Sequence, residues 1–247
     1  MISLLQIHKA WQSLKDPRFR RALGFGVSPS HEHRGMLSSL GDINTVVDVG
    51  ANVGQFALIC GSCFPNAKIH SFEPLSKARK VFLKVMEGSD RVFLHAVALG
   101  EHRAELQMHV TAKADSSSLL TPSLQASIFP GTHEVSTEVT LVMPLEERLS
   151  REEISSPAML KIDVQGYELQ VLRGCKTLLD CFDYVFVELS FVELYTGQAL
   201  APEVIGWLAE NGFALSGCYV SATSYLNGKM IQGDFLFRRS VTNAVIG

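Results

Sequence analysis

The chain has 247 residues, 47% of them hydrophobic, and its 22 basic and 25 acidic residues give a formal net charge of -3. This length suits a single domain with a sizeable core. The small net charge provides no field to attract a polyanion, so we expect no nucleic-acid partner. Five cysteines are an odd count, which indicates reduced thiols and a cytoplasmic protein.

The first 40 residues are expected to form a helical segment that packs on a domain spanning residues 41–247. Pro17 would interrupt this helix, whose apolar face would consist of Ile2, Leu5, Trp11 and Leu14. The basic residues of the segment leave peripheral contact with a membrane as an alternative. The sequence has neither a signal-peptide pattern nor an apolar run of about 18 residues that could span a bilayer. It does not predict an oligomeric state.

From residue 44 onward the pattern becomes strand, turn and helix, repeated. Residues 46–49 form a short apolar run that ends at Gly50, as expected for a buried parallel strand. The next helix would bury a face made of Val53, Phe56, Ala57, Cys60, Cys63 and Phe64. Further strands are predicted at residues 68–74, 91–99, 158–166 and 184–190, with helices after all but the second of these. Such units predict an α/β fold with a doubly wound, mostly parallel sheet.

Other strands are predicted without helices between them. The closing stretches "FALSGCYV" and "GDFLFRR" should therefore be antiparallel. In the middle of the chain, "ELQMHV" and "EVTLVMPL" alternate enough to be strands. They flank a Ser-, Thr- and Pro-rich loop near residues 111–137. A loop of this length in a compact domain is usually functional or disordered, and we expect it to cover the active site.

The turn after the first strand, "DVGANVG", indicates which cofactor the sheet would bind. A dinucleotide fingerprint needs glycines where this chain has Asn52 and Gln55. Asp48 would repel a diphosphate but suit an ammonium group, because unit charges about 4 Å apart interact by about 4 kcal/mol at an effective dielectric near 20. Glu73 ends the second strand, where such sheets bind ribose hydroxyls. Together the two carboxylates predict S-adenosylmethionine, although singly each could serve a helix N-terminus.

Four blocks of the sequence resemble the FkbM family of S-adenosylmethionine-dependent methyltransferases in order and spacing: "VVDVGANVGQF", "IHSFEP", "HAVALG" and "MLKIDVQGYELQVLRG". The resemblance covers about residues 44–190, and the closing "GDFLFRR" is also similar. It implies a Rossmann-like, seven-stranded class I methyltransferase fold. It also implies O-methylation of a sugar, a glycoconjugate or a secondary metabolite, so that a small molecule or glycan is the acceptor.

The resemblance also implies which residues hold the cofactor. The methionine portion would lie against Asp48, Gly50, Ala51, Asn52 and Gly54. The ribose would bind Glu73 beside Pro74, and adenine would lie near Val97. One departure is Gln165, where family members commonly have glutamate.

Transfer of a methyl group to a hydroxyl requires a base for the proton. Asp163 is the first candidate, since the carboxyl ends of parallel strands face the ligand crevice. Glu188 ends the neighbouring strand and should stand close to Asp163. Lys161 shares a strand face with Asp163 and is a third catalytic candidate. The alternative for Lys161 is a buried ion pair that does not touch the substrate.

A metal site is the less favoured use of these carboxylates. Asp163 and Glu188 could bind Mg²⁺ through oxygen and water, with Asp234 also available. No third ligand follows from the spacing, so we expect no metal. Cys60 and Cys63 have a C-x-x-C spacing but no second ligand pair, and they are expected in the core.

The acceptor would meet polar residues of the covering loop or the crevice rim, for which the candidates are Ser116, Ser117, His133 and Tyr195. His31 and His33, with Glu32 between them, are expected to be solvated, with a substrate contact as the alternative. Two other functions stay open. One is a nicotinamide-dependent oxidoreductase, and the other is a non-catalytic module that only binds the cofactor.

Overall fold

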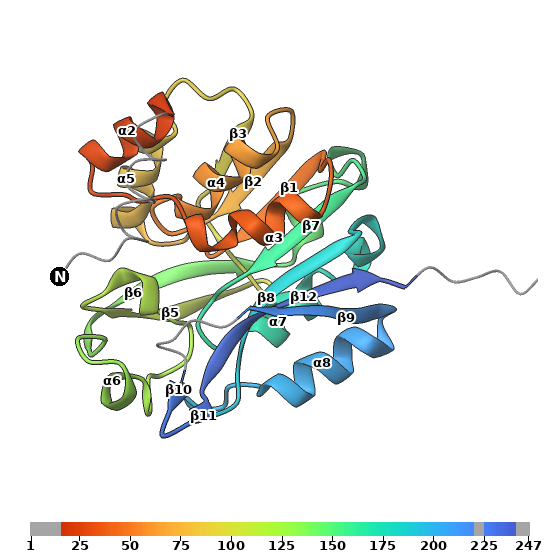
Figure 1. Cartoon of the computed structure of the whole chain (residues 1–247). Helices are drawn as coiled ribbons and strands as arrows, with labels where there is room; N and C mark the ends of the chain where they lie inside the picture. The colour runs from red at the N-terminus through yellow and green to blue at the C-terminus, as the bar shows by residue number, and fades with distance from the viewer. Residues whose placement is uncertain (1–15, 220–224, 241–247) are drawn as a thin grey trace, which may run out of the picture.

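The computed structural model describes residues 16–219 and 225–240, and a seven-stranded sheet forms its centre (Figure 1). The strand order is β3-β2-β1-β7-β8-β12-β9. These strands are β1 (Thr45–Val49), β2 (Lys68–Phe72), β3 (Val92–His95), β7 (Ala158–Ile162), β8 (Tyr184–Ser190), β9 (Phe213–Tyr219) and β12 (Gln232–Arg239). Strand β12 is antiparallel to β8 and β9, and the other pairs are parallel. The predicted fold class is confirmed.

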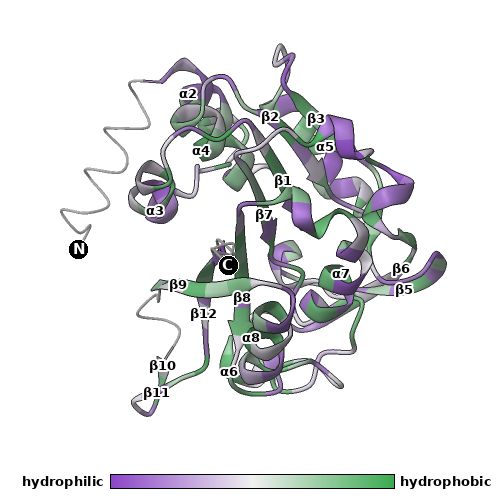
Figure 2. Ribbon diagram, turned by 90° about the vertical axis from the view of Figure 1, so that its right-hand side faces the viewer, coloured by the Kyte–Doolittle hydropathy of each residue, from purple (hydrophilic) through white to green (hydrophobic). Residues whose placement is uncertain are grey.

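Helices cover both faces of this sheet. On one face, the residues Val46, Ile69 and Met159 pack against α2 (Pro17–Gly24), α3 (Arg34–Ser39), α4 (Gln55–Cys63) and α5 (Ser76–Val85). On the other face, Val47, Leu160 and Val185 pack against α7 (Glu168–Gly174), η5 (Lys176–Cys181) and α8 (Ala201–Glu210). Because successive side chains of a strand point to opposite faces and both faces are covered, the central strands are mostly apolar, as the colouring of β8 in Figure 2 shows, and Asp48, Lys161 and Glu188 are the charged residues within β1, β7 and β8.

A smaller sheet with the order β4-β6-β5 adjoins the main one. Its strands are β4 (Ala98–Leu99), β5 (Ala104–Thr111) and β6 (Glu134–Met143). The prediction of one strand over residues 91–99 is wrong, because β3 pairs with β2 whereas β4 leaves the main sheet to pair with β6. Residues 112–133, here named the covering segment, connect β5 to β6 and contain η2 (Ala114–Ser116) and α6 (Gln125–Ile128).

Short elements complete the chain. The 3-10 helices η1 (His31–His33), η3 (Leu145–Glu147) and η4 (Arg151–Glu153) lie between the larger elements. A small hairpin of β10 (Tyr225–Leu226) and β11 (Lys229–Met230) precedes β12, and its turn residues Asn227 and Gly228 have positive φ angles. All five cysteines are free, and Cys60 is buried in α4 as expected.

The segment before β1 contains α2 and α3 in its described part. Pro17 begins α2, since proline is favoured in the first turn, and Asp16 caps it by accepting a hydrogen bond from the N–H of Arg18 at 2.9 Å. Phe19 and Leu37 anchor α2 and α3 in the core. The predicted apolar face at Ile2, Leu5, Trp11 and Leu14 lies outside the described residues. No helix in the described part of the chain is both long and apolar enough to cross a bilayer.

Candidate active site

A pocket that encloses about 550 Å³, space open to solvent included, lies where the C-terminal ends of β1, β2 and β7 meet, which is the edge at which such sheets bind ligands. Most of its wall is apolar. The apolar part includes Val49, Phe72, Pro74, Leu75, Ala98, Leu99, Met108, Leu119 and Val164. The polar residues that line it are Asn52, Glu73, Asp115, Ser117, Asp163, Gln165 and Tyr167. This composition suits a ligand with a flat apolar ring and polar groups at fixed points. We call it the cofactor cavity.

The turn after β1 forms one wall of the cofactor cavity and depends on backbone conformations with positive φ. Gly50 has a φ of 79°, and a Cβ atom placed on it would lie 1.9 Å from the carbonyl oxygen of Asp163. Only glycine therefore lets β1 and β7 approach this closely. Asn52 has a φ of 46°, and Gly54, at 96°, packs against Phe82 of α5 rather than facing the cavity. The N–H groups of Gly50 and Ala51 donate to the carbonyl of Phe72, which fixes the turn to β2.

Glu73 connects this turn to the end of β2. Its Oε2 accepts a hydrogen bond from the N–H of Asn52 at 2.8 Å, and its Oε1 accepts one from the N–H of Leu75 at 2.7 Å. Burial raises the pKa of Glu73 to about 7, although these two N–H groups favour the carboxylate. Glu73 thus lies at the cavity wall with both oxygens held in place, and each oxygen keeps a lone pair for a ligand hydroxyl.

Asp48 lies elsewhere than the sequence predicts. It has no exposed surface and does not line the cavity. Its Oδ1 lies 3.1 Å from Nζ of Lys161, the residue beside it in the register of β1 and β7. Neither carboxylate oxygen has a hydrogen bond of good geometry from any described residue. A direct contact between Asp48 and a ligand ammonium group is therefore not supported, because Lys161 occupies that position.

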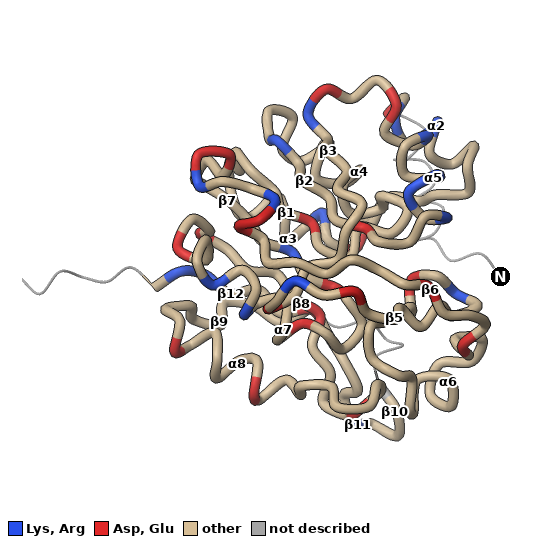
Figure 3. The backbone as a smooth tube through the Cα atoms, turned by 180° about the vertical axis from the view of Figure 1, so that it is seen from behind, with Lys and Arg blue, Asp and Glu red and all other residues tan. Residues whose placement is uncertain are grey.

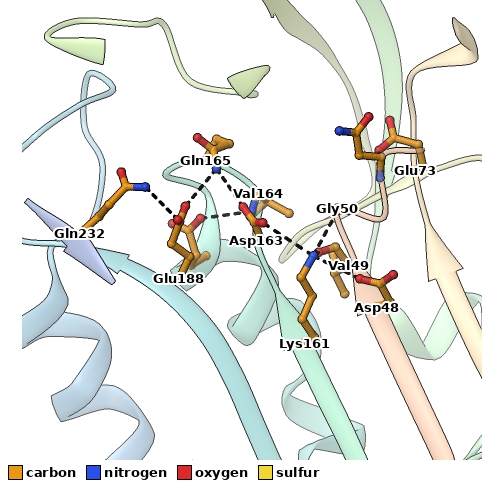
Figure 4. A network of polar contacts seen from close by, with 12 residues as sticks. Asp48, Val49, Gly50, Glu73, Lys161, Asp163, Val164, Gln165, Glu188 and Gln232 are labelled. Carbon is orange, nitrogen blue, oxygen red and sulfur yellow. Dashed lines mark hydrogen bonds and ion pairs between the residues drawn. The ribbon is translucent and has the colours of Figure 1, made fainter. Parts of the chain in front are cut away.

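Lys161 is a buried cation among carboxylates (Figure 4). Besides Asp48, its Nζ lies 3.8 Å from Oδ2 of Asp163 and donates a hydrogen bond to the carbonyl of Gly50 at 3.2 Å. Burial alone would lower the pKa of Lys161, but Asp48 and Asp163 outweigh burial and raise the pKa. The ammonium group also lies 5.4 Å from the centroid of the Phe56 ring. Lys161 stays protonated and holds the turns after β1 and β7 together.

Asp163 and Glu188 are brought together, as the sequence predicts, by the side chain of Gln165 (Figure 4). Asp163 lines the cofactor cavity, and 39% of its side chain is exposed. Glu188 lines neither that cavity nor the one described next, and its other oxygen accepts a hydrogen bond from Gln232 at 2.8 Å. Burial, followed by the charges of Asp163 and Asp234, raises the pKa of Glu188 well above its usual range. Asp163 is thus the member of the pair that a ligand can reach.

A second cavity of about 650 Å³ adjoins the first and shares Gly50, Asn52, Asp115 and Asp163 with it. We call it the outer cavity. The remaining residues that line it are Ser30, Glu32, His33, Ala51, Gln55, Phe56 and Lys161. The segment before β1 therefore supplies part of the site through Glu32 and His33. The pattern "HEH" drew attention to these residues, but the sequence did not place them beside Asp163.

Of the four residues predicted to bind the acceptor, the structure places only Ser117 on a cavity wall. Ser116 is buried, and its carbonyl accepts a hydrogen bond from the hydroxyl of Tyr195 at 2.9 Å. Tyr195 is itself buried, and His133 is exposed at the end of the covering segment. Val97, predicted near adenine, packs in the core beside the cavity residues Ala98 and Leu99.

Several cavity residues could not be found from the sequence. Met108 of β5 and Leu119 of the covering segment reach the cofactor cavity because they pack against Leu75 and Ala78 at the start of α5. Asp115 lies in a polar loop and has no local signal that marks it as a lining residue. In the described ranges, no three His, Cys, Asp or Glu side chains are grouped so that they could hold a metal ion.

The cofactor cavity fits S-adenosylmethionine in its chemistry. The apolar wall suits the adenine ring, and Glu73 presents a fixed acceptor for ribose hydroxyls. The side-chain oxygen of Asn52 is buried without a hydrogen bond from any residue that the structure describes. The backbone of the turn after β1 comes close to the carbonyl of Asp163, because Gly50 has no side chain.

Comparison with known proteins agrees with this geometry. A family model described as the methyltransferase FkbM domain matches residues 48–215. The hexuronic acid methyltransferase AglP of Haloferax volcanii is 30% identical over 145 residues, which are 58% of this chain and 54% of that protein. The 2-O-methyltransferase NoeI of Sinorhizobium fredii is 28% identical over 179 residues, 67% of this chain and 72% of that protein. The chain thus spans about half the length of the first relative and nearly three quarters of the second.

One solved methyltransferase structure can also be aligned with this chain. The magnesium protoporphyrin IX methyltransferase of Synechocystis, determined with bound S-adenosylmethionine, aligns with a TM-score of 0.47 and 10% identity over 85% of this chain and 81% of that chain. The match of the family model extends over more than half of the present sequence and includes the residues that line the cofactor cavity. The chain belongs to the FkbM family of S-adenosylmethionine-dependent methyltransferases.

Proposed function

We propose that this protein transfers a methyl group from S-adenosylmethionine to a hydroxyl of a sugar, a glycoconjugate or a secondary metabolite. The observation that carries the proposal is the position of Asp163, which lines both the cofactor cavity and the outer cavity. A carboxylate at this junction can accept the proton of a hydroxyl that enters through the outer cavity and approaches a ligand bound in the cofactor cavity. The names of the two relatives, a hexuronic acid methyltransferase and a 2-O-methyltransferase, support the choice of a sugar hydroxyl.

The residues that would hold the cofactor differ from those first expected. Glu73 would accept hydrogen bonds from the ribose, and Leu75, Leu99 and Met108 would contact adenine. Gly50 and Asn52 would lie along the methionine portion, whereas Asp48 would act only by keeping Lys161 in place. When bound, S-adenosylmethionine supplies an electrophilic methyl group on a sulfonium.

The acceptor would occupy the outer cavity. Asp163 would take the hydroxyl proton, since its side chain is partly exposed there, and Glu188 would act through Gln165 rather than on the substrate. Positioning of the hydroxyl in a confined site can remove several kcal/mol of the barrier. Glu32, His33 and Ser117 are the polar residues from outside the main sheet that we assign to acceptor or cofactor contacts.

The remaining partners and the location are also proposals. Basic and acidic residues are interspersed in the view of Figure 3, which supports the expectation that nucleic acid is not the substrate. The five free cysteines support a cytoplasmic location. Peripheral membrane contact through residues 1–40 stays an alternative.

Methyl transfer from labelled S-adenosylmethionine onto a panel of methyl glycosides, hexuronic acids and polyketide alcohols tests the proposal. We expect a singly methylated product with at least one sugar acceptor and its loss in Asp163→Asn. Binding of the cofactor without transfer to any acceptor would instead favour the non-catalytic module, and a tight NAD complex would favour the oxidoreductase.

A further inference from the structure

Gln165 occupies the centre of the polar network beside the outer cavity (Figure 4). Its Nε2 donates hydrogen bonds to Oδ1 of Asp163 at 2.8 Å and to Oε2 of Glu188 at 3.0 Å. A primary amide has two N–H donors, so this bridge uses both of them. Gln165 therefore fixes the rotation of both carboxylates.

The other atoms of Gln165 are bonded to the covering segment, directly or through Tyr195. The hydroxyl of Tyr195 lies 3.0 Å from Oε1 of Gln165 and 2.9 Å from the carbonyl of Ser116. The hydroxyl of Ser118 donates to the backbone carbonyl of Gln165 at 2.6 Å. Because Asp115, Ser117 and Leu119 line the cofactor cavity, these contacts connect the cavity wall to the carboxylate pair.

The backbone of Gln165 is held in a conformation that glutamine rarely adopts. Its φ is 57°, and the next residue, Gly166, has a φ of 102°. A left-handed conformation costs a non-glycine residue of the order of 1 kcal/mol or more, and such residues persist only where the surroundings hold them. Here Glu168 holds the turn by accepting hydrogen bonds from the N–H groups of Val164 and Gly166. The side chain of Gln165 is thereby aimed between Asp163 and Glu188.

We propose that Gln165 is a positioning residue that orients the Asp163 carboxylate for proton acceptance and couples it to the covering segment. The inference rests on the proposed function. A glutamate at this position would put a third negative charge between two others, whereas the neutral amide donates to both.

Other charged groups surround Asp163 and Glu188, so a test of Gln165 must control for added charge. The titratable groups that face the Asp163–Glu188 pair come from every neighbouring element, and they are Lys161, Asp234, Glu168, Glu32, His33, Asp115 and Tyr195. Lys161 is a cation in the folded state and is shared with Asp48. An added negative charge should therefore affect the pair strongly.

The test compares Gln165→Glu with Gln232→Glu. Both variants add one carboxylate in place of an amide that bonds Glu188, but only Gln165 also bonds Asp163. Side-chain carboxyl carbons of ¹³C-labelled protein, assigned with Asp163→Asn and Glu188→Gln, report the titration of each group without any acceptor. We expect Gln165→Glu to move the titration of both carboxyls to higher pH by roughly one unit or more, and Gln232→Glu to move mainly that of Glu188.

Two further variants separate orientation from charge and from folding. Gln165→Met keeps the size of the side chain but removes the bridge, and we expect it to lower the rate constant for transfer at saturating acceptor at least tenfold with little change in KM. Tyr195→Phe should increase hydrogen exchange of residues 112–133. The inference would be overturned if Gln165→Glu left the titration of both carboxyls unchanged, or if Gln232→Glu shifted Asp163 and Glu188 equally. The proposed function would still stand in either case, provided that the wild-type protein binds the cofactor. Loss of cofactor binding by the wild-type protein would instead overturn the proposed function.

Discussion

The ammonium nitrogen of Lys161 lies 3.1 Å from Oδ1 of Asp48, and both residues are buried side by side on neighbouring central strands. The position of this pair explains why Asp48, one residue before the end of β1, does not reach the cofactor cavity. Lys161 in turn holds the carbonyl of Gly50 and approaches Asp163, so the pair joins the two turns that shape the site.

Removal of one partner should destabilise the fold more than removal of both. Asp48→Asn leaves a buried ammonium with weaker compensation, and we expect a loss of about 3 kcal/mol in the free energy of unfolding. The double variant Asp48→Leu, Lys161→Met should lie closer to the wild type than Asp48→Asn does. Urea unfolding measures the stability of both variants. Asp180→Asn, which breaks the exposed ion pair with Arg151, is the control. A single variant as stable as the wild type would show that the pair is not structurally important.

Gly50 should be irreplaceable for a reason that Gly41 does not share. Both have positive φ angles, 79° and 75°, but a Cβ on Gly41 meets nothing within 4 Å, whereas a Cβ on Gly50 overlaps the carbonyl of Asp163. Gly41→Ala should therefore cost only about 1 kcal/mol of backbone strain. We expect Gly50→Ala to be much less stable and to lose cofactor affinity, as measured by thermal unfolding and calorimetry. Equal losses in the two variants would leave strain as the only cause.

The fold could be predicted from local patterns because each strand and its helix carry their own periodicity. The "VVDVG" and "YVFVELS" runs became β1 and β8 almost residue for residue. The break between β3 and β4 could not be predicted, since residues 92–99 are apolar except for His95 and only the pairing of β4 with β6 separates the two strands.

The site was less predictable, because a side chain's surroundings depend on elements far apart in the chain. Position at a strand end correctly brought Asp163, Glu188 and Glu73 to one edge of the sheet. The same reasoning failed for Asp48, one residue before the end of β1, because successive side chains of a strand point to opposite faces and a one-residue shift changes what the side chain meets. Tyr195 and Ser118 became hydrogen-bond partners of Gln165 across the fold, which no spacing indicates.

Asp163→Asn should separate catalysis from cofactor binding. The amide keeps the shape of the side chain but cannot accept a proton, so we expect the transfer rate to fall by about 10²- to 10⁴-fold. Affinity for S-adenosylmethionine should change by less than about threefold, because Glu73 and the apolar wall are unaltered. Single-turnover transfer and calorimetry are the measurements. Wild-type transfer rates in the variant would remove Asp163 from the role of base.

The stability of the fold should decrease on acidification through a histidine pair outside the site. His95 contacts His70 at 3.2 Å through Nε2 and accepts a hydrogen bond from Nε of Arg148 at 2.9 Å. Burial, together with His70 and Arg148, lowers the pKa of His95 from 6.5 to about 4. The unfolded chain therefore binds more protons between these values, so stability is present above pH 6.5 and is lost as the pH falls towards 4.

The size of this effect is at most roughly 3 kcal/mol, from the difference between the two pKa values. His95→Phe should flatten the dependence of unfolding free energy on pH over this interval, with a remainder from His70, whose pKa burial also lowers. Urea unfolding at a series of pH values makes the measurement. An unchanged slope in the variant would mean that His95 binds a proton in the folded protein as readily as in the unfolded chain.

Calorimetric titration of S-adenosylmethionine into the wild-type protein and into Glu73→Gln tests the central claim most directly, which is that the cavity at the ends of β1 and β2 holds the methyl donor. An amide at this position must turn a donor towards the N–H of Asn52 or of Leu75, so it cannot keep both hydrogen bonds. The account predicts one molecule bound per chain, displaced by S-adenosylhomocysteine, and affinity reduced at least tenfold in Glu73→Gln. No binding by the wild type, or equal affinity in the variant, would contradict it.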